Sequence, residues 1–334
     1  MRDAERWLRR QVDEVRDLLR EADEAFGRGD LAAANDDLDE ALVILDMAEF
    51  VNDTVHELRA RTLNELGLVH RHAEATEEAH DFHARAADTI EELDRLDEEF
   101  VYEAAAIKLN AVNSILSVEG DLGEARRRMN RIEELVERGR EEHGQPPQDV
   151  QLSLEQNRSL LESLSGNLEQ AAESAERALE LTDSLVDEGM PSALPQAART
   201  CQQMSVQLFE AGEHERAVEW GQRAEEVAER AHEHFGEAAV PLYVVSQINL
   251  LSFYEELHRF ADAEDALWKA IETAGPDPEI LWRGREFYEY CNELLELAAP
   301  PVQVEMGVED LENVIDEIGG LPDPEQMQRF VAPE

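Results

Sequence analysis

Side-chain amides recur at one fixed spacing along the sequence. The first series is Asn64, Asn110, Gln156 and Gln202, and the second is Asn157, Gln203 and Asn249, with successive members 46 residues apart. An amide both donates and accepts hydrogen bonds, so a row of amides can pair with the alternating N–H and C=O groups of an extended peptide. The same row can instead bridge neighbouring helices or remain solvated. The spacing is consistent both with peptide binding and with these structural roles.

Three arginines accompany the amides at related positions, namely Arg16, Arg61 and Arg199. A guanidinium group can hold a carboxylate through two parallel hydrogen bonds, which suits recognition of an acidic or C-terminal group of a partner. The alternative for each of them is pairing with one of the chain's own abundant carboxylates.

Four histidines lie close together in the sequence: His70, His72, His80 and His83. Imidazoles at such short spacings can ligate zinc. However, His70 and His83 fall on expected core positions, no cysteine joins them, and the spacing matches no closed zinc motif. The two cysteines, Cys201 and Cys291, form no CxxC pair and no disulfide framework, which fits a reducing cytosol. We therefore expect no metal site.

No pattern in the sequence points to catalysis. It holds no glycine-rich phosphate loop, no GxSxG elbow and no Cys-His pair tied by a local motif. Carboxylates are so frequent that a catalytic pair does not stand out from the rest. The sequence predicts a protein that is not an enzyme and needs no cofactor.

The charge is extreme, with 78 acidic residues against 30 basic ones and a net charge of −48. This disfavours nucleic acid and anionic membranes as partners, because both require positive charge on the protein. Only Lys108 and Lys269 are lysines. Acidic excess with few lysines favours a halophilic origin, such as a haloarchaeon, where salt screens the repulsion between carboxylates. Charged residues follow Met1 at once and no apolar run has membrane-spanning length, so we expect a cytoplasmic protein.

The elements that position these side chains follow from a repeat of about 46 residues. Six alanines share one local pattern, seen for example at Gly120-Asp121-Leu122-Gly123-Glu124-Ala125, and they are Ala34, Ala79, Ala125, Ala171, Ala217 and Ala263. Apolar residues recur three and four positions apart, which is helical spacing. A fixed period of this length predicts an all-α solenoid of about six helix-turn-helix repeats, in which neighbouring repeats stack to bury their apolar faces.

We expect the solenoid to span residues 1–298. Its repeats start near Val15, Ala60, Ala106, Leu152, Ala198 and Val244, and a capping helix covers 279–298. After Pro300 and Pro301 we expect residues 299–334 to form a short amphipathic helix around 308–318 and a mobile C-terminal tail.

These repeats resemble tetratricopeptide repeats (TPRs). Counted from the starts above, position 20 is Ala in all six repeats, and position 27 is Ala in all except the third, which has Ile132. Position 15 is Gly except at Glu74 and His258. The period exceeds the standard TPR of about 34 residues. It is similar to the extended class found in kinesin light chain.

The resemblance implies a right-handed α-α superhelix whose concave face, lined by the first helix of each repeat, holds a peptide or partner helix. The amides fall at positions 5 and 6 and the arginines at position 2; Phe209, at position 12, is a further groove candidate. We therefore interpret the chain as a protein-interaction scaffold or peptide receptor. The alternative is a ligand-responsive sensor whose solenoid changes shape when it binds a small molecule or signalling peptide.

Overall fold

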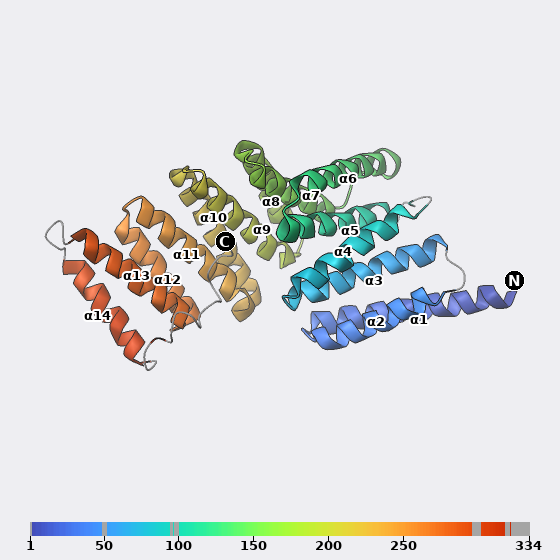
Figure 1. Ribbon diagram of the computed structural model, residues 1–334, viewed down its shortest axis with the longest axis horizontal. Helices are drawn as coiled ribbons and strands as arrows, with labels where there is room; N and C mark the ends of the chain where they lie inside the picture. Colours follow the sequence, from blue (N-terminus) through green and yellow to red (C-terminus); the bar gives the residue numbers. More distant parts are fainter. Residues whose placement is uncertain are drawn as a thin grey trace. The chain divides into compact units, whose positions relative to one another are not determined.

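The computed structural model describes residues 2–48, 52–93, 96, 100–295, 302–317 and 321. These residues form helices joined by short connections, with no β-strand among them (Figure 1). The all-α helical-repeat fold predicted from the sequence is confirmed. The chain divides into two compact units, Met1–Ser165 (unit 1) and Gly166–Glu334 (unit 2), and each is described by itself.

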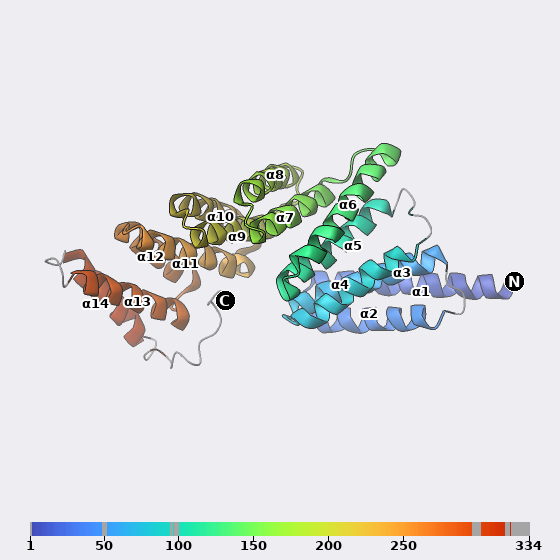
Figure 2. The ribbon, with the colours of Figure 1, turned by 45° about the horizontal axis from the view of Figure 1, so that its top comes forward.

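Unit 1 contains helices that alternate between two roles. The first helices of the repeats, here called A helices, are α1 (Arg2–Gly27), α3 (Asp53–His72), α5 (Val101–Ser114) and α7 (Gln148–Leu164). The second helices, or B helices, are α2 (Leu31–Asp46), α4 (Thr76–Glu91) and α6 (Leu122–His143). Each helix packs against the next along the chain, and each A helix also contacts the next A helix (Figure 2). Successive A helices therefore present their side chains side by side.

Unit 2 continues the alternation. Its B helices are α8 (Leu168–Asp187), α10 (His214–Phe235), α12 (Phe260–Ala274) and α14 (Val302–Glu317), and its A helices are α9 (Leu194–Glu210), α11 (Val240–Glu256) and α13 (Pro278–Leu295). α13 lies where the capping helix is expected at 279–298, and its role as a cap stays a prediction. α14 begins earlier than the helix expected around 308–318. Leu311 and Ile315 of α14 are buried in the same core as Phe287 of α13. The boundary at 298/299 stays a prediction, and the tail expected after Pro322 lies outside the described residues.

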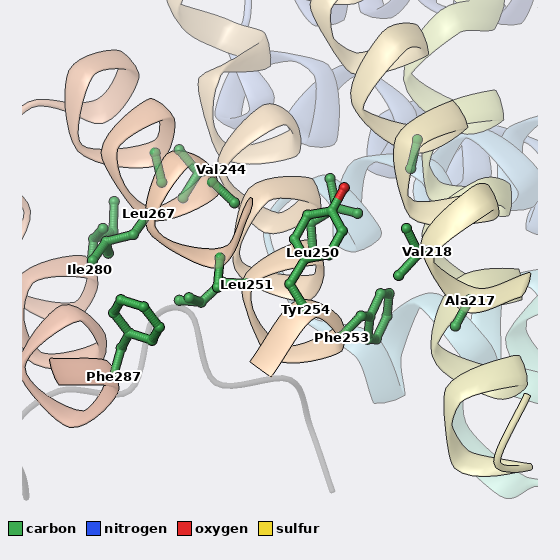
Figure 3. Packing of buried hydrophobic residues seen from close by; sticks show 14 of the residues in the cluster. Ala217, Val218, Val244, Leu250, Leu251, Phe253, Tyr254, Leu267, Ile280 and Phe287 are labelled. Carbon is green, nitrogen blue, oxygen red and sulfur yellow. The ribbon is translucent and has the colours of Figure 1, made fainter. Parts of the chain in front are cut away.

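The six alanines of the repeat pattern lie on the first turn of the B helices. Ala79 is 3% exposed and the other five are fully buried, as predicted. Figure 3 shows how the larger residues fill the core of unit 2: Leu250, Phe253 and Tyr254 of α11 lie toward Ala217 and Val218 of α10. Leu251 lies on the other side of α11, toward the core that includes Leu267. A small residue on the first turn of each B helix gives the neighbouring A helix room to pack.

The turn between helices A and B has a left-handed residue at position 15 in every repeat. The φ angles are +77° at Gly29, +60° at Glu74, +63° at Gly120, +78° at Gly166, +80° at Gly212 and +56° at His258. Each turn places this residue just after helix A. Glycine adopts the conformation freely, whereas an L-residue there costs roughly 1–2 kcal/mol. The two departures from glycine noted in the sequence therefore keep the same turn as the glycine repeats and accept backbone strain.

Three ion pairs join successive B helices of unit 2 at regular intervals. Arg216, Arg223 and Arg230 of α10 pair with Glu169, Glu176 and Asp183 of α8, at N–O distances of 2.9, 3.4 and 2.8 Å. Both sets of partners are seven residues apart along their helices, which is close to two helical turns. The pairs are solvent-exposed, so each contributes at most about 1 kcal/mol, but together they fix the register of α8 against α10.

Candidate binding face of the A helices

The predicted amide series brings two residues together in unit 1. Asn110 of α5 donates through Nδ2 to Oδ1 of Asn64 on α3 at 2.9 Å, and Asn64 donates to Oε1 of Glu65 at 3.2 Å. Asn64 is buried and Asn110 half-buried. The hydrogen bond between these two amides therefore joins neighbouring A helices, as expected if the amides bridge helices. Asn64 in turn donates to Glu65, whose carboxylate lines the cavity described below.

Arg61 lies one turn away on the same helix and holds a carboxylate, but one of the chain's own. Its guanidinium donates to both oxygens of Glu103 on α5, with each N–O distance at 2.5 Å. The same group lies 5.3 Å from the centre of the Phe100 ring. Both partners stay accessible, since the side chains of Arg61 and Glu103 are 35% and 38% exposed. Arg16, by contrast, is an exposed residue of α1 with a loose contact of 3.9 Å to Asp13.

A cavity of about 220 Å³ lies next to this ion pair. Its apolar walls come from α1, α2 and α3: Leu19, Ala22, Phe26, Leu38 and Val69. Its polar groups are Asp23 of α1, Arg61 and Glu65 of α3, and Glu103 of α5. Three successive A helices thus line one cavity. It is far larger than the roughly 10–15 Å³ that a single water needs.

Glu65 has an unusual electrostatic environment in this cavity. Burial raises the pKa of its carboxyl, the hydrogen bond from Asn64 opposes that rise, and the nearby carboxylates Asp23 and Glu103 add to it. Within the described residues neither Asp23 nor Glu65 forms an ion pair with a basic side chain. Among the described residues, the cavity therefore holds three carboxylates, of which Glu103 is paired with a basic side chain.

The other predicted amides divide by burial. Gln202 of α9 is buried and donates to the carbonyl of Leu242 at 2.8 Å and to Oγ of Ser246 on α11 at 2.9 Å, so it bridges A helices as Asn110 does. Gln156 and Asn157 are buried in α7, and Asn157 donates to the Ser153 carbonyl of its own helix.

The remaining groove candidates of unit 2 are more accessible. Gln203 and Arg199 of α9 are exposed, and Asn249 of α11 is half-buried. Phe209 is half-buried, with its ring 4.8 Å from that of Phe253 and 5.0 Å from that of His214. Arg199, Gln203 and Asn249 remain available to a partner, whereas Phe209 already packs against its neighbours.

The histidine group does not converge on one point. His83 is fully buried, and burial, aided by the charge of Arg71 and by His80, lowers its pKa to about 4. His70 packs its ring against Phe82, while His72 is exposed and contacts the edge of Phe26. In the described part of the chain, no group of three or more His, Cys, Asp or Glu side chains is arranged to hold a metal ion.

The two cysteines are buried thiols. Burial raises the pKa of Cys201 to about 12 and that of Cys291 to about 11. Because the thiolate is the nucleophilic form, neither thiol is activated at neutral pH.

Sequence reasoning missed several residues of these sites. Asp23, Glu65 and Glu103 are hidden among the chain's 78 acidic residues, and no spacing marks them. The arginines of α10 did carry a usable signal, since they are spaced by seven residues along one helix. Nothing in the sequence could have marked the cavity, because it forms only where α1, α2, α3 and α5 meet.

The sequence matches no family model and no curated protein. The structure is similar to solved structures. The apo form of RapI has a TM-score of 0.59 and 15% identity, with 91% of this chain and 77% of RapI covered. A STAND (signal transduction ATPase with numerous domains) protein with a tetratricopeptide repeat sensor from Pyrococcus horikoshii has a TM-score of 0.52 and 14% identity, with 87% of this chain and 42% of that protein covered.

A Rap protein complexed with Competence and Sporulation Factor has a TM-score of 0.51 and 13% identity, with 92% of this chain and 93% of the Rap protein covered. In the described residues no helix is both long enough and apolar enough to cross a membrane. At such low identities the likenesses establish the fold, which is a TPR-like helical repeat.

Proposed function

We propose that the chain is a non-enzymatic interaction module that binds a peptide or protein segment on its A helices. The observation that carries this proposal is the cavity of about 220 Å³ in unit 1, because three successive A helices line it together. It joins apolar walls to a few fixed polar groups, which is the usual composition of a binding site. The exposed Arg199 and Gln203 on α9 offer unit 2 comparable contacts.

Several features support a protein or peptide as the partner. One of the similar structures is a Rap protein in complex with Competence and Sporulation Factor. The net charge of −48 disfavours nucleic acid and anionic lipid. The near-absence of lysine supports a cytoplasm rich in salt as the working environment, and the extended TPR class of kinesin light chain remains the best description of the repeat length.

The proposal is tested by selecting binders from a random-sequence peptide library displayed on phage, in about 1 M KCl. Arg199→Gln and Gln203→Ala change exposed residues of the A helix α9, while Glu40→Gln and Glu180→Gln are matched changes of exposed residues on B helices. Loss of a charged hydrogen bond should weaken a peptide held at Arg199 by about tenfold or more, and loss of a neutral one at Gln203 by about threefold to tenfold. A library without binders, or binders blocked only by the B-helix changes, would overturn the proposal.

A sensor that changes shape on binding is the second candidate. It is favoured by the similarity to the STAND protein from Pyrococcus horikoshii, which carries a tetratricopeptide repeat sensor. A scaffold should keep its dimensions when a selected peptide binds, whereas a sensor should change its radius of gyration. Small-angle X-ray scattering of the free and bound protein separates the two.

A further inference from the structure

The cavity in unit 1 has more negative than positive charge at its polar end. Of its four charged groups, Arg61 uses its guanidinium fork on both oxygens of Glu103. That pairing leaves the carboxylates of Asp23 and Glu65 without a basic partner among the described residues. Asp23 is exposed, whereas Glu65 is half-buried. A carboxylate that is partly removed from water and has no counter-charge is costly, and a cation brought beside it recovers part of that cost.

The opposite end of the cavity is apolar. Leu19 and Phe26 of α1, Leu38 of α2 and Val69 of α3 form its walls. A ligand that fits both ends must therefore carry a positive charge at the tip of an apolar stem. Lysine and arginine side chains have this construction, since three or four methylene groups precede the charged group.

We infer that this cavity is the receptor for a lysine or arginine side chain of the bound peptide, with its stem against Leu19 and Val69 and its charge between Asp23 and Glu65. The inference rests on the proposed function for the peptide itself and adds the chemistry of one anchor residue. It places the specificity for a basic residue on α1 and α3.

Other occupants fit the same groups less well. An anion would meet three carboxylates, while the only guanidinium in the cavity is already paired. A wholly apolar side chain would cover Glu65 and leave it without a counter-charge. A divalent metal ion lacks a ligand set, because no group of three or more His, Cys, Asp or Glu side chains in the described residues is arranged to hold one.

The test uses the full-length chain and small probes that carry a single side chain. Acetyl-arginine amide and acetyl-lysine amide are titrated against protein labelled at Leu and Val methyl groups, at the lowest KCl concentration that keeps the protein fully helical. Acetyl-norleucine amide has a stem of similar length without charge, and acetyl-glutamate amide carries the opposite charge. The methyl signals of Leu19 and Val69 should shift saturably with the two basic probes only, with Kd on the order of 1 mM.

Two variants locate the charge. Glu65→Gln keeps an oxygen that can accept the hydrogen bond from Asn64, so this variant should remain folded. Asp23→Asn changes an exposed residue and should not disturb the core either. Glu65→Gln should weaken the basic probes by about tenfold or more, and Asp23→Asn by about twofold to fivefold because its carboxylate is exposed. The matched Glu40→Gln on α2 should leave them unchanged. Circular dichroism establishes that all three variants are folded. The inference is wrong if acetyl-norleucine amide binds as tightly as acetyl-arginine amide, or if Glu65→Gln binds the basic probes as the parent does.

The two proposals can fail separately. If selected peptides bind but carry no basic residue that Glu65→Gln affects, the interaction module stands and the basic anchor is wrong. If the basic probes bind as expected while the library gives no binders, the chemistry of the cavity stands and the peptide-binding function is wrong.

Discussion

Replacing His83 should remove a large part of the pH dependence of unit 1. The imidazole is fully buried, and neither ring nitrogen has a hydrogen-bond partner among the described residues. The space for the ring comes from Gly67, where a Cβ atom would lie only 2.6 Å from it. Protonation would place a charge in this apolar site beside Arg71 and His80, so the folded pKa falls from 6.5 to about 4.

The sign of the effect follows from proton binding. The unfolded chain takes up a proton at His83 near pH 6.5, whereas the folded chain stays neutral there until about pH 4. The unfolded state therefore binds more protons in this window, and the free energy of unfolding falls as the pH is lowered through it. The loss amounts to roughly 2 kcal/mol at pH 5 relative to pH 8. This contribution is fully present above 6.5 and absent below about 4.

The assay compares the parent with His83→Leu. Native-state hydrogen exchange in α3 and α4 gives the local free energy of opening at each pH, in about 1 M KCl so that surface charges are screened. The difference between parent and variant isolates His83, because the other titrating groups are common to both proteins. His72→Leu, at an exposed site, is the control and should follow the parent. An equal pH dependence in parent and His83→Leu, or an NMR titration of His83 near its ordinary pKa, would refute this reasoning.

Three further predictions concern the repeat and its charge. Ala171→Leu should overpack the buried start of α8 and lower the free energy of unfolding by roughly 1–3 kcal/mol in urea titrations, whereas Ala261→Leu at an exposed site of α12 should change it little. Glu74→Gly and His258→Gly should each raise the free energy of unfolding by roughly 0.5–1 kcal/mol in thermal denaturation, because the relief of left-handed backbone strain exceeds the added entropy of the unfolded chain. Gly212→Ala should lower the free energy of unfolding by about 1 kcal/mol. A loss of stability in both glycine variants would contradict the strain argument. Helicity followed by circular dichroism should fall below a few tenths molar KCl and recover above about 1 M, since screening relieves the repulsion of 78 acidic residues; full helicity in dilute buffer would remove the basis for a halophilic origin.

The repeat could be predicted in detail because it is enforced at many positions at once. Six alanines in one register specify where every helix pair must approach closely, and the structure buries all six. The turn is kept even where its glycine is missing, since Glu74 and His258 adopt the same left-handed backbone as their glycine counterparts, which the sequence did not indicate. The division at Ser165/Gly166 was not predictable, because the sequence keeps its period across it.

The roles of the amides could not be read from their spacing. Periodicity specifies which residues are equivalent, but not how deeply each is buried. Asn64 and Gln202 bridge A helices, while Gln203, the next residue along α9, is exposed. One residue along a helix turns the side chain by about 100°, which is enough to exchange a core contact for solvent. The groove role remains a prediction, and it now rests chiefly on the residues that stay accessible.

Burial also determines which of the many carboxylates can indicate a binding site. An exposed acidic residue in this chain adds to solubility and says little about a ligand. Glu65 differs because it is half-buried between α1 and α3 beside two other carboxylates, and it accepts a hydrogen bond from Asn64. Such a group gains more from a partner's cation than an exposed one does, since less solvent competes for it. The acidity of the chain therefore becomes selective at the cavity that three A helices of unit 1 line together, and we infer that it selects a basic side chain there.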